Sequence, residues 1–416
     1  MSKKLIKNIG VLATPTGSYA KSGRAQGEIS IYKDAAIVCE NGEILGIYEG
    51  DTIPNGQFDE IIDAKGQLVT PGLVDSHTHL VFGGWREHEV PLKLRGASYL
   101  EILEAGGGII DTVRNTRKDS FKELYDKSMG LLDDIKKLGI TTIEIKSGYG
   151  LDIENEMKQL EVIREMRKDT LVDICPTFMG AHAVAPEFAG KPDEYVDYIV
   201  NEMIPELERR NHEEEIPLAV FCDVFCENSA FNVEQSRKVL IAGKKAGLIP
   251  KIHADEINVI GAVPLGTEMN AISADHLIMI DNDGINHLAD SATIATVLPS
   301  TSFYLGEHFA PAKELIKRNV PVAIASDFNP GSCPSYNLQL AMNLAYLKYR
   351  MTPAEILTAV TLNAACAVDM ADKVGTIERG KQCDIVIWKA KNLETLLYRF
   401  GDNMAETVIK KGEVIC

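Results

Sequence analysis

Two histidines separated by one residue are the first groups in this chain that suggest chemistry. His77 and His79 end a short apolar run that begins at Leu73. Side chains alternate between the two faces of a strand, so a strand through this point would direct both imidazoles to one side. Two imidazoles on one side can hold a single metal ion. A pair of polar histidines at a strand end is the plainer alternative, and a two-residue motif does not decide between them.

Three later apolar runs end in side chains of the same kind. His253, His276 and Asp327 each lie at or just beyond the end of such a run, and Glu256 lies three residues past His253. The chain contains nine histidines, and four of them occupy strand ends of this type. Chance does not readily explain that distribution, so the sequence favours one shared site.

Three imidazoles and one carboxylate form a ligand set that suits zinc or iron. The expected ligands of one Zn2+ or iron ion are His77, His79, His253 and Asp327. Water bound to such an ion ionises near neutral pH, and Asp327 is placed to take its proton. We expect Glu256 to bind a ring N–H and to carry a proton to the leaving nitrogen. We expect His276 to hydrogen-bond the substrate oxygen. For His276 and Asp327 the alternative is an ordinary strand-end cap. For Glu256 the alternative is a solvated loop carboxylate.

The sequence predicts one metal ion rather than two. In a barrel of parallel strands, a two-metal site usually needs a bridging, carboxylated lysine on the fourth strand. The fourth apolar run, 218–225, contains no lysine, whereas Lys146 ends the second run.

The elements that must position these groups repeat along the middle of the chain. Apolar runs alternate with amphipathic stretches such as 121–138, 153–166, 195–209 and 233–246. The eight apolar runs are 73–79, 141–146, 171–178, 218–225, 249–254, 271–276, 293–298 and 320–326. Apolar strands that alternate with helices indicate a parallel sheet covered by helices, and eight in succession favour a (β/α)8 TIM-like barrel. An open doubly wound sheet is the alternative, but its glycine-rich fingerprint after a strand is absent.

The two ends of the chain show a different pattern of short strands and turns. The segment 35–48 contains an Asn-Gly hairpin signal at Asn41, and 384–388 and 407–415 also resemble strands. We expect both ends to form one small β-sandwich domain. The expected boundaries are 1–68 and 373–416 for this domain and 69–372 for the barrel.

Composition limits the possible partners. A net charge of −17 argues against nucleic acid and anionic membranes as partners. We find neither a secretory signal nor an apolar run long enough to span a membrane, and we expect a cytoplasmic protein whose eight cysteines are reduced. The long helical patterns at 334–350 and 352–370 could pack within one chain or across a homodimer. Residues 106–108, three glycines after a helical pattern at 99–105, could hinge a lid or simply stop a helix.

The paired histidines, the later histidines and aspartate, and the split β domain resemble the amidohydrolase superfamily over most of the chain. The finer motifs are similar to those of the imidazolonepropionase family within it. They are FGGWR at 82–86, KSGYG at 146–150, FMGAH at 178–182, HADE at 253–256 and SDFNPGS at 326–332.

The resemblance implies hydrolysis of the ring amide C–N bond of 4-imidazolone-5-propanoate, giving N-formimino-L-glutamate in histidine degradation. Arg86 would grip the carboxylate tail of this small molecule, although pairing with Glu87 or Glu89 is the alternative. The other substrate-binding residues that the resemblance implies are Tyr149, His182, Glu256, Asn329, Gly331 and Ser332. The family often has threonine at the position of Ser332, which keeps the hydroxyl.

Two rival functions remain open at this stage. A deaminase of a cyclic amidine or nucleobase shares the metal ligands but does not need Arg86 near the metal. A catalytically inactive barrel that serves as a binding scaffold would tolerate loss of a ligand or proton carrier, yet the whole set is present.

Overall fold

A parallel sheet of eight strands forms the centre of the molecule. The computed structural model describes residues 2–52, 56–96, 106–213 and 215–416. In order across the sheet the strands are β13 (Val322–Ile324), β12 (Ile294–Val297), β11 (Ser273–His276), β10 (Ile249–Ala254), β9 (Phe221–Cys226), β8 (Asp173–Ala181), β7 (Ile140–Lys146) and β6 (Leu73–Asp75). This order follows the sequence without the reversal that a doubly wound sheet requires.

Residues just beyond the first and last strands close the sheet into a barrel. Thr78 forms a parallel bridge with Phe328. The backbone N–H of Asp327 donates to the carbonyl of His77 over 3.0 Å, and that of His79 donates to the carbonyl of Phe328 over 2.8 Å. The predicted (β/α)8 barrel is therefore confirmed, and the closure lies beside the two histidines.

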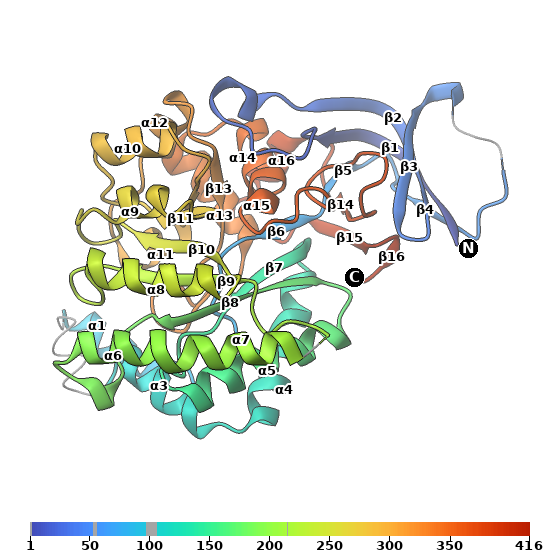
Figure 1. The fold of residues 1–416 in the computed structure, drawn as a ribbon. Helices are drawn as coiled ribbons and strands as arrows, with labels where there is room; N and C mark the ends of the chain where they lie inside the picture. The colour runs from blue at the N-terminus through green and yellow to red at the C-terminus, as the bar shows by residue number, and fades with distance from the viewer. Residues whose placement is uncertain (1, 53–55, 97–105, 214) are drawn as a thin grey trace.

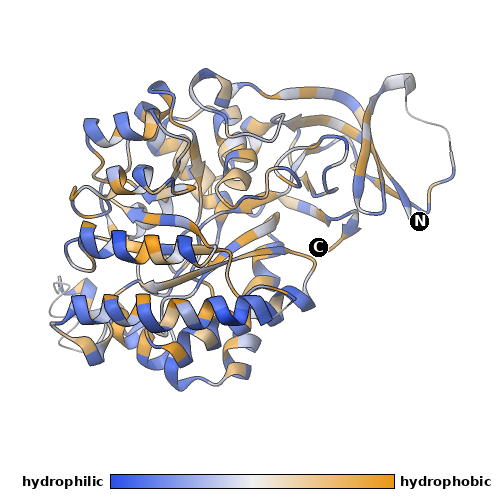
Figure 2. Cartoon of the chain, in the orientation of Figure 1, coloured by the Kyte–Doolittle hydropathy of each residue, from blue (hydrophilic) through white to orange (hydrophobic). Residues whose placement is uncertain are grey.

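Helices surround the barrel (Figure 1). The helices of this layer are α1 (Val90–Leu94), α3 (Ile109–Lys118), α4 (Phe121–Lys136), α5 (Ile153–Asp169), α6 (Pro192–Tyr198), α7 (Ile204–Glu213), α8 (Val233–Lys245), α9 (Ala262–Glu268), α10 (Asn282–Ala289), α11 (Pro299–Leu305), α12 (Ala312–Lys317), α13 (Leu338–Leu344), α14 (Pro353–Ala359), α15 (Leu362–Cys366) and α16 (Leu393–Tyr398). Figure 2 shows hydrophilic and hydrophobic residues together on the long helices, as expected when one face meets the sheet. Capping boxes at Ser120, Asn232 and Thr352 start α4, α8 and α14. No helix in these described ranges is long and apolar enough to cross a membrane.

Strands from both chain ends form a second, mixed sheet at one side of the barrel, where both termini lie (Figure 1). Its order is β16 (Glu413–Val414), β15 (Ala405–Lys410), β14 (Ile385–Trp388), β5 (Leu68–Pro71), β1 (Lys3–Thr14), β2 (Ser30–Glu40) and β3 (Glu43–Glu49), with β4 (Glu60–Asp63) also paired to β1. The hairpin predicted at Asn41 joins β2 to β3. A separate apolar cluster that includes Ile6, Ile37 and Ile385 packs in this unit. The expected small β domain is thus one continuous sheet whose strands come from both ends, and its exact boundaries stay a prediction.

Three local predictions were wrong. Strand β6 ends at Asp75, so His77 and His79 lie beyond it rather than within it. The helix expected over 334–350 begins only at Leu338, capped by Asn337, and its last part, 345–349, is a π-helix. The helix expected over 352–370 is interrupted near Thr361, whose hydroxyl donates to the Leu357 carbonyl over 2.6 Å. The helical pattern at 99–105 lies outside the described residues.

Candidate metal centre and active site

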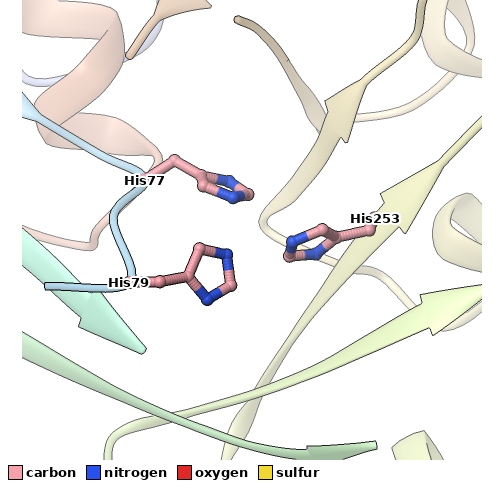
Figure 3. A group of neighbouring side chains, drawn as sticks. All are labelled: His77, His79 and His253. Atoms are coloured by element: carbon pink, nitrogen blue, oxygen red, sulfur yellow. The ribbon is translucent and has the colours of Figure 1, made fainter. Parts of the chain in front are cut away.

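Three imidazoles converge at the carboxyl end of the barrel (Figure 3). One nitrogen from each of His77, His79 and His253 lies within 4.8 Å of the others, and all three residues are buried. The first two come from the segment after β6 and the third from β10. Asp327 Oδ1 lies 3.5 Å from His77 Nε2 and 3.9 Å from His79 Nε2. The four groups expected to bind metal are therefore adjacent.

Buried carboxylates hold two of these imidazoles by their other nitrogen. Asp275 Oδ2 lies 2.7 Å from His77 Nδ1, and Asp223 Oδ2 lies 3.1 Å from His253 Nδ1. A carboxylate only accepts, so the Nδ1 of His77 acts as the donor and its Nε2 keeps a lone pair for a metal. The Asp223 contact of His253 is an ion-pair contact without hydrogen-bond geometry. Both Nε2 atoms are buried and have no hydrogen-bond partner. A bound metal ion would provide the missing partner.

A network of buried charges lies beneath the imidazoles. Lys146 Nζ is 2.8 Å from Glu144, 2.7 Å from Asp223 and 3.8 Å from Asp275, and Lys251 Nζ is 3.1 Å from Glu144. All five side chains are fully buried, so each charge is stabilised by the opposite charges beside it rather than by water. Burial opposes the ionised form of Asp223, but His253 and Lys146 together hold its pKa well below its usual range.

The electrostatic environment keeps two ligand imidazoles neutral. Burial, followed by the charge of Lys146, lowers the pKa of His77 well below its usual range. Burial and the neighbouring His182 do the same to the pKa of His79. A neutral imidazole is the form that binds metal. Burial opposes protonation of His253, but Asp223 raises its pKa above the usual value, so the lowered pKa holds only for His77 and His79. The donor set and the two unpaired nitrogens fit a metal ion such as zinc or iron.

The residues expected to move protons lie beside this centre. One potential ligand atom of His276 lies within 4.8 Å of such atoms of His77 and Asp327. The His276 Nδ1 lies 3.5 Å from Glu256 Oε1. Burial and then the Asp327 charge raise the pKa of Glu256 to about 8. Burial raises the pKa of Asp327 to about 6, although the Thr301 hydroxyl, 2.6 Å from Asp327 Oδ2, stabilises its ionised form.

Two of these residues have unusual backbones. His276 has φ of 77° and Asp327 has φ of 56°, in the left-handed region that disfavours side chains. Such strain concentrates where a site imposes a geometry on the chain.

Arg86 approaches the same end of the barrel from the loop after β6. Its Nε and Nη2 donate to the two carboxylate oxygens of buried Glu89 over 2.8 and 3.1 Å. Its Nη1 lies against Gly331, where an added Cβ would be only 2.1 Å away. Arg86 and the loop after Asp327 are thus in contact, as a shared site for a carboxylate tail requires. The ion pair weighed as an alternative is also present, with Glu89.

Tyr149 and His182 line the centre on the side of His79. The His182 ring stacks on His79 with centroids 4.8 Å apart, and Tyr149 lies 5.8 Å from His79. Burial lowers the pKa of His182 to about 3, so the ring is neutral and available as a hydrogen-bonding group.

Asn329, Gly331 and Ser332 form a turn directly after Asp327. The Asn329 side-chain oxygen accepts from the N–H groups of Gly331 and Ser332 over 2.8 and 2.7 Å. The Asn329 amide therefore shapes this loop, and a direct contact of these three residues with substrate stays a prediction.

Comparison with known proteins identifies the family. The chain is 48% identical to an imidazolonepropionase from Geobacillus kaustophilus over 393 residues, covering 93% of this chain and 91% of that protein. It is 44% identical to an imidazolonepropionase from Alkaliphilus metalliredigens, covering 99% and 97%. The chain belongs to the imidazolonepropionase family.

Models of the amidohydrolase family match residues 242–415 and 60–97 of this chain as well. A triazine hydrolase variant superposes with a TM-score of 0.75 at 16% identity, covering 99% of this chain and 94% of that one. A zinc-bound adenosine deaminase from Xanthomonas campestris superposes with a TM-score of 0.70 at 17% identity, covering 99% and 92%. These likenesses show the fold. The family and the His/Asp cluster together indicate that the site holds a metal ion.

Four buried charged residues that support the metal centre were not anticipated from the sequence. Asp223, Asp275, Lys146 and Lys251 lie in apolar runs, where charged side chains are unusual. That conflict between residue type and environment was the available signal. Glu89 was anticipated only as an alternative partner of Arg86, and its complete burial could not be predicted from a position so close to other charged residues.

Proposed function

We propose that this protein hydrolyses the ring amide C–N bond of 4-imidazolone-5-propanoate to give N-formimino-L-glutamate, in histidine degradation. The observation that carries the proposal is the near-full-length identity to imidazolonepropionases. The arrangement of Arg86 and the imidazole cluster at one end of the barrel supports it. The substrate is a small molecule with a carboxylate tail, and a cytoplasmic location and a possible homodimer go with the proposal as predictions.

We infer that His77, His79, His253 and Asp327 hold one Zn2+ or iron ion. Such an ion supplies a Lewis acid and lowers the pKa of a bound water. The network around Lys146 supports a count of one, because its ammonium already neutralises the carboxylates behind His77 and His253. Metal analysis that found two tightly bound ions per chain would contradict this count.

The remaining residues bind the substrate or transfer protons. Arg86 offers Nη1 to the carboxylate tail, since Glu89 occupies its Nε and Nη2. Tyr149 and His182 orient the ring, and His276 hydrogen-bonds the ring carbonyl oxygen as negative charge develops on it. Asp327 accepts a proton from the attacking water. Glu256 delivers a proton to the ring nitrogen as the C–N bond breaks.

A turnover assay tests the proposal. The purified metal-loaded protein is incubated with 4-imidazolone-5-propanoate and, separately, with a panel of nucleobases and cyclic amidines. We expect formation of N-formimino-L-glutamate and no ammonia from the panel. Ammonia from a panel compound would support a deaminase, and no turnover of any compound would support an inactive scaffold.

Arg86→Ala separates tail binding from chemistry. We expect this variant to raise KM by roughly 100-fold, because the charged Nη1 donor for the carboxylate tail is lost, with a smaller effect on kcat. Steady-state kinetics measure both constants. An unchanged KM would remove Arg86 from the tail-binding role.

A further inference from the structure

Three buried glutamates outside the proposed reacting set each anchor a loop above the barrel. Glu89 accepts from Arg86 and from the N–H of Gly108 over 2.7 Å. Glu156 accepts from the N–H groups of Gly150 and Leu151 over 2.8 and 2.9 Å, beside Tyr149. The third, Glu227, follows β9 and is fully buried. Each anchored loop carries a residue with a different proposed task.

Glu227 binds the segment that directly follows Glu256. One carboxylate oxygen accepts from the N–H groups of Ile257 and Asn258 over 3.1 and 3.0 Å. The other oxygen accepts from the Asn258 side-chain amide over 2.9 Å and from the N–H of Asn228 over 2.8 Å. Four donors thus converge on one carboxylate, and three of them belong to the loop that carries Glu256.

The segment before Glu256 is held independently. The N–H of Leu277 donates to the Ala254 carbonyl over 3.0 Å, and the N–H of Met279 donates to the Asp255 carbonyl over 2.8 Å. Asp255 has φ of 48°, an unfavourable backbone angle that the surrounding bonds must maintain. Glu256 is therefore fixed from both sides, by the segment that follows β11 and by Glu227.

We propose that Glu227 is a positioning residue for turnover, which holds the Glu256 carboxyl group beside His276. The proposal rests on the proposed function, because the task of Glu256 belongs to that reaction. Proton transfer requires the donor within hydrogen-bond reach of the reacting nitrogen, and a displacement of about 1 Å costs on the order of 100-fold in rate. Since Glu227 lies behind the loop, its effect falls on the proton-transfer step and not on tail binding.

The variant Glu227→Gln tests this role with little change in volume. An amide keeps one acceptor oxygen and places an NH2 group against two of the former donors, so about half of the anchoring bonds are lost. We expect kcat to fall by roughly 10- to 100-fold with a much smaller rise in KM, since Glu256 is also expected to bind a ring N–H. Glu89→Gln should give the opposite pattern, a raised KM with a smaller change in kcat, because Glu89 holds Arg86.

Glu355→Gln is the matched control. Glu355, on the outer helix α14, is also a buried glutamate that accepts from a backbone N–H, that of Thr352, and it pairs with Lys313 of α12. The same chemical change there should leave kcat and KM unchanged. Amide hydrogen exchange at Ile257 and Asn258 should accelerate in Glu227→Gln and not in Glu355→Gln.

A double variant decides whether Glu227 acts through Glu256. Glu227→Gln combined with Glu256→Gln should be no slower than Glu256→Gln alone, whereas independent effects would multiply. Wild-type kcat in Glu227→Gln, multiplied losses in the double variant, or an equal loss in Glu355→Gln would each overturn the proposal. If Glu227→Gln does not fold, Asn258→Ala, which removes one of the four bonds, takes its place in the same measurements. Absence of wild-type turnover would instead contradict the proposed function, and the exchange measurement would still report on the anchor.

Discussion

A single hydrogen bond decides which nitrogen of His77 is free. Asp275 accepts from Nδ1 over 2.7 Å, so the unpaired Nε2 faces the other ligands. The same carboxylate lies 3.8 Å from Lys146, which offsets its charge in the buried interior. Orientation of the ligand and neutralisation of the site therefore depend on one side chain.

Asp275→Asn is expected to weaken metal binding by about 10- to 100-fold. The neutral amide is a weaker acceptor than the carboxylate, so it stabilises the Nδ1–H tautomer of His77 less. Competition with a chromophoric chelator measures the affinity. Asp283→Asn is the control, since Asp283 pairs with His287 at 3.8 Å on an exposed part of α10. Equal affinities for the wild type and Asp275→Asn would contradict the role assigned to this bond.

At the scale of elements, an ion-pair cluster joins the start of β8 to the second sheet. Asp173 on β8 lies 2.6 Å from Lys410 and 2.9 Å from Lys411, and Lys410 also pairs with Asp384. Lys410 is fully buried, so the loss of a partner leaves a charge that water cannot solvate. These contacts hold the barrel against the sheet formed by the chain ends.

Asp173→Asn should lower the free energy of unfolding by about 1–3 kcal/mol near neutral pH. Burial alone would raise the pKa of Asp173, but Lys410 and Lys411 bring it below the ordinary value of 3.8. A lowered pKa gives a stabilisation that is complete above the unfolded pKa and is lost as the pH falls through the folded pKa. The difference between wild type and variant, measured by urea unfolding, should be constant from about pH 5 to 8 and shrink below about pH 4. A difference that grew on acidification would contradict this assignment.

The elements themselves were largely predictable because strands and helices leave different apolar periods. All eight barrel strands overlap their predicted apolar runs, and the run 249–254 matches β10 at both ends. Asp327 and the clustered histidines followed from the rule that barrel chemistry gathers at the carboxyl ends of strands. Burial of Glu227 and the pairing of Asp223 with His253 could not be predicted, since both depend on contacts between residues far apart in sequence. The break near Thr361 was equally hidden, because no proline or glycine marks it within the apolar stretch.

At the scale of the whole molecule, the metal site is a small part of a large buried core. Removal of the ion by a chelator should abolish turnover and leave the far-UV circular dichroism nearly unchanged. The Tm should fall by several degrees, because a ligand that binds only the folded state stabilises it. Addition of one equivalent of zinc or iron should restore both activity and Tm. Loss of secondary structure on chelation would show that the barrel needs the ion to fold.

The closure of the barrel has a consequence for the order in which the protein matures. In the described part of the chain no ladder joins β6 to β13, and the bridge between Thr78 and Phe328 connects them beside the candidate ligands. The second sheet likewise needs β14 and β15 to sit beside β5. A ribosome must therefore synthesise more than three quarters of the chain before Asp327 can meet His77, and nearly all of it before the second sheet is complete. Metal loading is then a late event, and a nascent chain halted before β13 has no complete set of ligands to offer.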